Sequence, residues 1–292
     1  IVDAPVTVEM TDPPLSVMKA KKDSSMNDAL TMLAEGRGDA LVSTGNTGAL
    51  FTGATLIVRK IKGIKRPAIA SILPMSPPVL LLDSGANISV TPSDLEQFAI
   101  MGSIYMHKIY GLSAPRIGLL NNGTEESKGT ELQLEAYKLL SESPSLNFVG
   151  NIEANMVPKD ACDVLVTDGF TGNILLKSIE GMGKMMLRTM KDIFYADVVS
   201  KVSALLVKKK LNEVKTLFDP NEYGGAPILG IAKPVIKAHG SSNAKAVKNA
   251  IRQAIAYADS GVIYNIARET KLFTPAAAPK SEGSGVAVKS EK

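Results

Sequence analysis

Short apolar runs along the chain lead into polar loops that contain glycine, and segments with helical periodicity follow. Such runs occur at 40–42, 79–82, 117–120, 164–166 and 235–238. Strands that alternate with helices in this way are typical of an α/β fold built around a mainly parallel sheet. Because parallel strands end at the same edge of a sheet, we expect their loops to converge on one ligand-binding crevice.

Two segments depart from this alternation. From 181 to 218, Met, Ile, Val and Leu recur at helical spacing beside the run Lys208-Lys209-Lys210, which predicts two helices that project from the domain. Packing in the core or at a dimer interface is the general expectation for such stripes, whereas a basic flank also suits an anionic membrane surface or a protein partner. Residues 274–292 lack apolar periodicity and predict a disordered tail after a single domain over 1–273.

The composition of the 292 residues narrows the class of protein. With 45% hydrophobic and 21% charged residues, the chain has material for a core and is neither disordered nor collagen-like. The net charge of +4 is too mild to favour a nucleic-acid partner. Cys162 alone excludes an internal disulfide framework and fits a reducing cytoplasm. The sequence shows neither a signal peptide nor the roughly 18 consecutive apolar residues of a spanning helix.

The glycine loops favour an anionic ligand, because glycine permits close approach of the backbone and amides at a helix start attract phosphate. None of them matches the dinucleotide fingerprint or the Walker A pattern, so a nucleotide site is not supported. Ser43, Thr44 and Asn46 add neutral donors to the first loop. A single loop of this kind is more often an ordinary turn, and only the combination favours a phosphate site.

Several single residues have both a chemical and a structural interpretation. Lys128 could neutralise a phosphate or oxyanion, or be a solvated surface lysine; Asn173 could donate to a carbonyl oxygen, although capping a helix is the default role of such an Asn. His239 could contact phosphate, transfer a proton or simply hold its loop. For His107 and Cys162 we expect structural roles, and the chain has no serine nucleophile elbow and no zinc motif.

Motifs at the strand ends occur together over nearly the whole chain before the tail. They are Lys21-Lys22-Asp23-Ser24-Ser25, Ser43-Thr44-Gly45-Asn46-Thr47-Gly48-Ala49, Leu82-Asp83-Ser84-Gly85-Ala86-Asn87, Leu119-Leu120-Asn121-Asn122-Gly123-Thr124-Glu125, Lys128-Gly129, Phe148-Val149-Gly150-Asn151-Ile152-Glu153, Asp168-Gly169-Phe170-Thr171-Gly172-Asn173, Tyr223-Gly224-Gly225-Ala226 and His239-Gly240-Ser241-Ser242. In combination they resemble the PlsX family of phosphate acyltransferases.

This resemblance implies a fold and an activity. The family's fold is a three-layer α/β/α sandwich related to phosphotransacetylase and the isocitrate dehydrogenase group. Its members transfer a fatty acyl group from acyl-acyl carrier protein to inorganic phosphate, and the acyl phosphate feeds bacterial phospholipid synthesis. The resemblance further implies a homodimer without cofactor or metal, located in the cytoplasm and in peripheral contact with the anionic inner face of the cell membrane.

The resemblance also assigns site residues. The family's catalytic pair falls on Lys128 and Asn173. The glycine loops are then expected to bind phosphate and the thioester through Ser43, Thr44, Gly45, Asn46, Thr47, Asp83, Gly85, Asn87, Asn121, Gly123, Glu125, Asp168, Gly169, Gly172, His239, Gly240 and Ser241. The family normally begins with a strand and an Asp-Ala-Met-Gly-Gly-Asp loop, so we expect this chain to lack that first strand-helix unit.

The expected reaction is direct attack of a phosphate oxygen on the thioester carbonyl. Lys128 would offset the phosphate charge and Asn173 would donate to the developing oxyanion. The basic residues Arg59, Lys60, Lys62, Lys65 and Arg66 are candidates for docking the acidic carrier, as is the run 208–210. Two alternatives remain, a coenzyme A-dependent phosphotransacylase and a catalytically impaired scaffold on the membrane.

Overall fold

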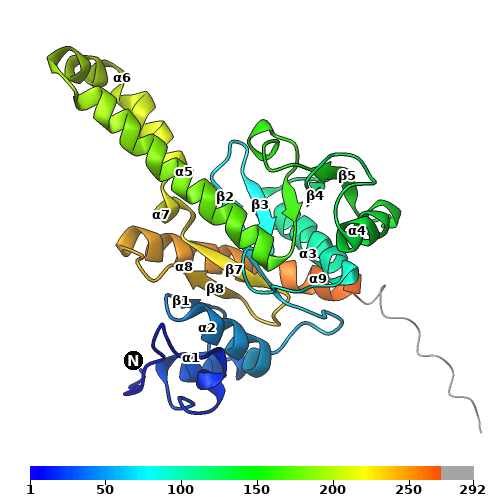
Figure 1. Cartoon of the computed structure of the whole chain (residues 1–292). Coiled ribbons are helices and arrows are strands. Elements are labelled where there is room, and N and C mark those ends of the chain that lie inside the picture. Colours follow the sequence, from blue (N-terminus) through cyan, green and yellow to red (C-terminus); the bar gives the residue numbers. More distant parts are fainter. Residues whose placement is uncertain (271–292) are drawn as a thin grey trace, which may run out of the picture.

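A single eight-stranded sheet forms the middle of the molecule in a computed structural model that describes residues 1–270 (Figure 1). The tail predicted at 274–292 lies outside the described residues. The strand order is β1-β8-β7-β2-β3-β6-β4-β5. The strands are β1 (Leu41–Ser43), β2 (Ala68–Leu73), β3 (Val79–Leu82), β4 (Arg116–Leu120), β5 (Asn147–Ile152), β6 (Val164–Val166), β7 (Gly225–Leu229) and β8 (Val235–Ala238).

Helices follow most of the strands, as the alternating pattern predicts. The helices are α1 (Ser25–Ala34), α2 (Thr47–Gly53), α3 (Pro92–Tyr110), α4 (Glu131–Glu142), α5 (Gly169–Tyr195), α6 (Val198–Leu217), α7 (Pro220–Tyr223), α8 (Ala244–Asp259) and α9 (Val262–Thr270). Short turns of other helix types occupy Pro14–Met18, Ala54–Val58 and Val157–Lys159.

Alternate residues of the central strands point to opposite faces of the sheet and bury against different helices. Leu80 and Leu82 belong to one large cluster with residues of α3, α4, α8 and α9. Leu81 belongs to a second cluster, on the other face, with residues of α5. A third cluster on that other face packs α1 and α2 against Ile69 and Ile228. The expected three-layer α/β/α arrangement is therefore confirmed.

The direction of the strands is less uniform than expected. β1 runs parallel to β8, and β3, β6, β4 and β5 run parallel to one another. Three antiparallel pairs, β8 with β7, β7 with β2 and β2 with β3, separate these two groups, so the groups run in opposite directions. The prediction that every loop leaves at one edge of the sheet is therefore wrong, because β2 and β3 are joined by a short hairpin rather than by a crossover helix.

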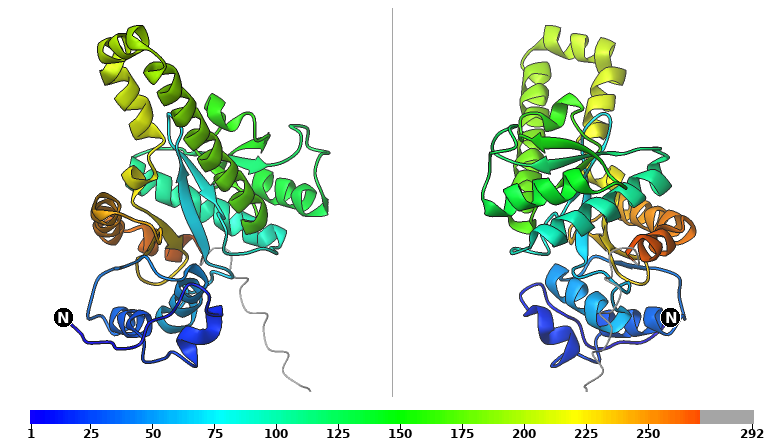
Figure 2. Two further views of the ribbon diagram at one scale, coloured as in Figure 1. Left: turned by 60° about the vertical axis from the view of Figure 1, so that its left-hand side comes forward. Right: turned by 90° about the vertical axis from the view of Figure 1, so that its right-hand side faces the viewer.

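Helices α5 and α6 form a hairpin that projects away from the sheet (Figures 1 and 2). The pair predicted over 181–218 is present, although α5 begins at Gly169, inside the domain. None of the residues of α6 is buried, and Leu205 and Leu206 are 70% and 84% exposed. The core-packing interpretation of this stripe is therefore wrong for the isolated chain. Among residues 1–270, no helix is both long and apolar enough to span a membrane.

Candidate functional site

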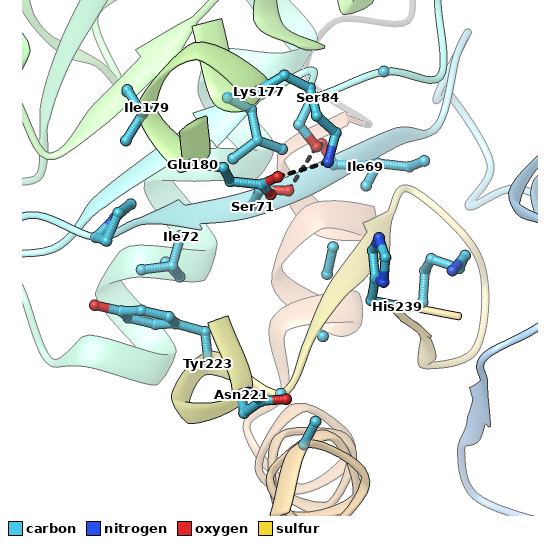
Figure 3. Close-up of a pocket in the computed structure, with 18 of the residues that line it drawn as sticks. Ile69, Ser71, Ile72, Ser84, Lys177, Ile179, Glu180, Asn221, Tyr223 and His239 are labelled. Carbon is cyan, nitrogen blue, oxygen red and sulfur yellow. Dashed lines mark hydrogen bonds and ion pairs between the residues drawn. The ribbon is translucent and has the colours of Figure 1, made fainter. Parts of the chain in front are cut away.

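A cavity of about 420 Å³ lies over β2 and β7, on the sheet face that carries α1, α2 and α5 (Figure 3). Ile69 and Ser71 of β2 form part of its floor, and α5 forms one wall. Five residues of the predicted site line this cavity, and they come from four separate loops and helix starts. They are Thr47, Gly85, Asn173, His239 and Ser241.

The loop after β3 is shaped by the buried carboxylate of Asp83. This carboxylate accepts hydrogen bonds from the backbone amides of Ile69, Gly85, Ala86 and Asn87, at 2.6 to 3.2 Å. Burial raises the pKa of Asp83, and these hydrogen bonds act against that rise. Asp83 therefore holds the loop in shape and does not itself line the cavity. Gly85 is the predicted residue of this loop that does.

The first turn of α5 packs directly on that loop. The amide of Gly169 donates to the carbonyl of Asn87 at 2.7 Å, and a Cβ at Gly172 would lie 2.0 Å from the carbonyl oxygen of Asp83. Gly85 has a φ of +144°, and a Cβ built on it would lie 3.5 Å from the side chain of Asn173. The clash at Gly172 and the positive φ of Gly85 require glycine, and the two loops meet at Asn173.

The side-chain amide of Asn173 is available to a ligand. Asp168 is the residue that caps α5, because its carboxylate accepts from the amide of Thr171 at 2.9 Å and from its hydroxyl at 2.7 Å. Asn173 is the fifth residue of the helix and is exposed to the cavity, so the default interpretation of Asn173 as a helix cap is wrong.

One face of α5 continues along the cavity beyond Asn173. Lys177, Glu180 and Lys184 also line it, at the spacing of successive helical turns. The ammonium of Lys177 lies 2.7 Å from the carboxylate of Glu180, and Figure 3 shows this pair over the cavity. Our sequence prediction missed these three residues, although the intervals of four, three and four from Asn173 could have identified them.

His239 and its loop form another wall. Its Nδ1 lies 3.2 Å from the backbone amide of Ser241 and 2.7 Å from the Ser241 hydroxyl. Since the amide can only donate, Nδ1 is the acceptor and Nε2 carries the ring proton. Lys237 precedes this loop on β8 and also lines the cavity, a second lysine that our sequence prediction missed.

The floor of the cavity is partly polar and partly apolar. The hydroxyls of Ser71 and Ser84 lie 2.7 Å apart (Figure 3). Ser84 also donates to the carbonyl of Ile69 at 3.0 Å. Apolar side chains that include Leu176, Ile179 and Phe218 line other parts of it. Such a mixed lining can accept a ligand with a charged head and an apolar chain.

Other predicted residues shape loops and do not line this cavity. Asn46 donates to the carbonyls of Glu9, Met10 and Asp12, at 3.0 to 3.1 Å, and its Oδ1 caps α2. Asn87 donates to the carbonyl of Pro67 at 2.7 Å. The predicted residues outside the cavity lining are Ser43, Thr44, Gly45, Asn46, Asp83, Asn87, Asn121, Gly123, Glu125, Lys128, Asp168, Gly169, Gly172 and Gly240.

Lys128 lies in an exposed loop after β4. Its carbonyl accepts from the side-chain amide of Asn121 at 3.0 Å, and its backbone amide donates to the carbonyl of Glu125 at 3.1 Å. Because β3, β6 and β4 are parallel neighbours, this loop leaves the sheet at the same ends as the loops that carry Gly85 and Asp168. Lys128 thus lies at the same edge as the start of α5, although it does not line the cavity.

His107 and Cys162 have the structural roles expected of them. Nδ1 of His107 lies 2.7 Å from the carbonyl of Leu112, just beyond the end of α3. Cys162 is fully buried, and burial raises the pKa of its thiol to about 12. No group of three or more His, Cys, Asp or Glu in the described residues is arranged to hold a metal ion.

The architecture defines an α/β protein of the phosphotransacetylase fold. A phosphotransacetylase from Streptococcus pyogenes superposes with a TM-score of 0.54 at 18% identity, and the match covers 88% of this chain and 78% of the other. A phosphotransacetylase from Staphylococcus aureus gives a TM-score of 0.52 at 16% identity over 82% and 70% of the two chains.

Sequence comparison identifies the family. The family model for the "Fatty acid synthesis protein" matches residues 1–265. The phosphate acyltransferase of Bacillus subtilis is 45% identical over 273 residues, which are 93% of this chain and 82% of the relative. That of Lysinibacillus sphaericus is 48% identical over 268 residues, 91% and 81% of the two chains. The chain therefore belongs to the PlsX family of phosphate acyltransferases, enzymes of fatty acid and phospholipid synthesis.

Proposed function

We propose that this chain transfers a fatty acyl group from acyl-acyl carrier protein to inorganic phosphate, giving acyl phosphate and free carrier protein. The observation that carries the proposal is the convergence of Gly85, the free amide of Asn173 and the loop of His239 on one cavity that also contains lysines. A phosphate acyltransferase needs such a combination, because both a phosphate and a developing oxyanion must be stabilised.

The reaction needs no group covalently attached to the enzyme. A phosphate oxygen attacks the thioester carbonyl, the new C–O bond forms, and the tetrahedral intermediate collapses with cleavage of the C–S bond. The sulfur leaves as a thiolate. Because the pKa of the corresponding thiol is near 8.5, a strong general acid is unnecessary. Positioning of the two substrates and stabilisation of charge supply the catalysis, without cofactor or metal.

In this proposal, Asn173 and Lys128 stabilise different negative charges. The Asn173 amide donates a hydrogen bond to the oxyanion, from a helix start that is fixed by the capping of Asp168 and the close approach at Gly172. Lys128 offsets the negative charge of phosphate from the neighbouring loop, where its side chain is exposed. The remaining predicted residues, such as Asp83 and Asn46, act by holding their loops in place.

The experiment measures thiol release from long-chain acyl-acyl carrier protein, with and without phosphate, together with formation of acyl phosphate. We expect phosphate-dependent release, and kcat lower by about 10²–10³ in Asn173→Ala and in Lys128→Ala. Ser178→Ala, at an exposed position of α5 outside the cavity lining, is the matched control. Full turnover of both variants at saturating phosphate would refute these roles, and coenzyme A thioesters as the better donors would favour a phosphotransacylase.

The segment 59–66 is the surface we propose for docking the acidic carrier. This segment holds five cations, and one of them, Arg66, forms an ion pair with Asp94 at 3.3 Å. Asn87 joins Pro67, the residue after this segment, to the Asp83 loop of the site. Charge attraction of this kind mainly speeds encounter, so we expect the carrier KM to rise with salt. A KM independent of salt would count against this surface.

The α5–α6 hairpin carries the proposed contacts with a second copy of the chain and with the membrane. Its exposed apolar side chains lie beside the lysine run 208–210, a combination that suits the anionic inner face of the cell membrane. We propose that residues 1–273 act as one domain in a homodimer and that this domain binds the membrane peripherally. The mass in solution, measured by light scattering, tests the dimer, and twice the chain mass is expected.

A further inference from the structure

One wall of the cavity holds a group of cationic and hydrogen-bonding side chains around His239, and the mechanism above gives no individual role to Lys237 or Ser242 among them. Lys237 lies on β8, and His239 and Ser242 lie in the loop that follows. Lys177 faces the same cavity from α5. Helix α8 begins two residues after Ser242, so the positive end of its dipole adjoins this group.

Lys237 is a partly buried cation without a carboxylate partner among the described residues. Its ammonium donates to the carbonyl of the adjacent Ala238. Burial lowers the pKa of Lys237, and the positive charge of Lys177 lowers it further. Lys177 is paired with Glu180 at 2.7 Å, whereas the partly buried ammonium of Lys237 has no such partner, so an anion bound in the cavity would stabilise Lys237.

Two further donors on this wall are unused. Nδ1 of His239 accepts from the amide of Ser241, which leaves Nε2–H of the ring as a donor. The hydroxyl of Ser242 is buried and has no hydrogen-bond partner in the described part of the chain. Buried hydroxyls are usually paired, so an unpaired one that lines a ligand cavity indicates a partner supplied by the ligand.

We propose that Lys237, together with His239 and Ser242, binds a phosphate group in this cavity. An ammonium, an imidazole N–H and a hydroxyl are donors suited to several oxygens of one phosphate. Lys177 is one helical turn from Asn173 on the cavity face of α5. A phosphate held by Lys237 therefore shares one cavity with Asn173, the proposed oxyanion donor.

The ligand chemistry is that of a phosphate oxyanion, which has two sources if the proposed function holds. Inorganic phosphate is the nucleophile, and the prosthetic arm of the carrier also bears a phosphodiester. The catalytic role of the phosphate bound here rests on the proposed function. Binding of phosphate to the protein alone, in contrast, can be measured without any acyl donor.

The test measures the Kd of inorganic phosphate by calorimetry on the full chain, and the KM of phosphate and of acyl-acyl carrier protein separately. Lys237→Met is expected to weaken phosphate binding by about 10- to 100-fold, the loss of one charge-assisted hydrogen bond. Lys237→Arg is expected to restore part of it, and Ser242→Ala to raise the Kd less than Lys237→Met does. Lys248→Met, an exposed lysine of α8 outside the cavity lining, is the control.

Each outcome is decisive. A raised Kd and KM for phosphate in Lys237→Met, with the carrier KM unchanged, supports the site with inorganic phosphate as its ligand. A raised carrier KM alone supports the site with the phosphodiester arm as its ligand. Unchanged values in both Lys237→Met and Ser242→Ala, or equal losses in Lys248→Met, overturn the inference. Phosphate binding that depends on Lys237 without any acyl transfer would refute the proposed function and leave this site standing.

Discussion

Asn173 is placed by residues that themselves do not line the cavity. Asp168 occupies the N-cap of α5, which leaves the Asn173 amide free, and Gly172 lets the helix approach the backbone of Asp83. Asp83 in turn gathers the amides of its loop around one buried carboxylate. The donor to the proposed oxyanion is therefore held by a sequence of local hydrogen bonds rather than by a direct contact of its own.

Cys162 gives a prediction at the scale of one residue. Its thiol is buried and has a pKa of about 12, so the thiolate is scarce at neutral pH. We expect iodoacetamide to leave the native protein unmodified at pH 8, as followed by mass spectrometry, and to modify it once after unfolding. Cys162→Ala should keep full turnover, with some loss of stability from the cavity it creates. Rapid modification of the native protein with loss of activity would indicate that Cys162 is reactive and needed for turnover. That result would contradict a mechanism without an acyl-enzyme intermediate.

At the scale of elements, the α5–α6 hairpin separates two roles within one helix. The first turns of α5 line the cavity and pack against the sheet through Leu175, Leu176 and Ile179. The rest of α5 and the whole of α6 extend beyond the domain (Figure 2). Apolar side chains along both, such as Ile193 and Leu206, are exposed. The site and the proposed membrane contact are thus joined by one continuous helix of 27 residues.

The hairpin also gives a prediction for membrane binding. The double variant Leu205→Ser/Leu206→Ser is expected to weaken binding to anionic vesicles more than tenfold, because each buried leucine contributes about 1.5–3 kcal/mol. Co-sedimentation with vesicles measures the effect. Both side chains are exposed in the chain, so the melting temperature of the variant should stay within a degree or two. Leu134→Ser, an exposed leucine of α4, is the control, and undiminished binding of the double variant would contradict the proposal.

The elements also show how far the sequence alone could lead. The strands that alternate with glycine loops predicted an α/β fold around a mainly parallel sheet, since each loop reports a local strand-to-helix turn, whereas the three layers were implied by the family resemblance. Strand direction is not local: the hairpin between β2 and β3 reverses half of the sheet, and the apolar runs at 68–73 and 79–82 do not reveal the pairing. Lys237 was missed for the same reason, because only the fold shows that a helix face and a strand side chain share one cavity, whereas the helical spacing from Asn173 could have identified Lys177.

At the scale of the molecule, the two faces of the sheet are covered differently. One face packs against α3, α4, α8 and α9 in a single cluster. The other face is divided, with α1 and α2 over one part and α5 over another. The candidate site lies where this second layer is interrupted, so the continuous face stabilises the fold while the divided face leaves room for substrates.

The Arg116–Asp163 pair links β4 to the residue that precedes β6, and it predicts how global stability depends on pH. The guanidinium donates to both carboxylate oxygens of Asp163, at 2.8 and 3.1 Å, and the backbone amide of Arg116 donates to Asp163 at 2.7 Å. Burial acts to raise the pKa of Asp163, but these hydrogen bonds outweigh it and the net shift is downward. The pair therefore stabilises the fold at neutral pH.

The sign of the pH dependence follows from that shift. A carboxyl whose pKa is lower in the folded state contributes stability above its unfolded pKa of about 3.9, and this stability is lost as the pH falls through the folded value. Arg116→Gln should lower the free energy of unfolding by about 1–2 kcal/mol at pH 7, a value reduced because the Arg116 side chain is 34% exposed. Urea titrations at pH 7 and below pH 4 should show this difference shrinking in acid. Arg268→Gln, at an exposed arginine 3.9 Å from Glu269, is the control. A difference that grows in acid would refute the assignment.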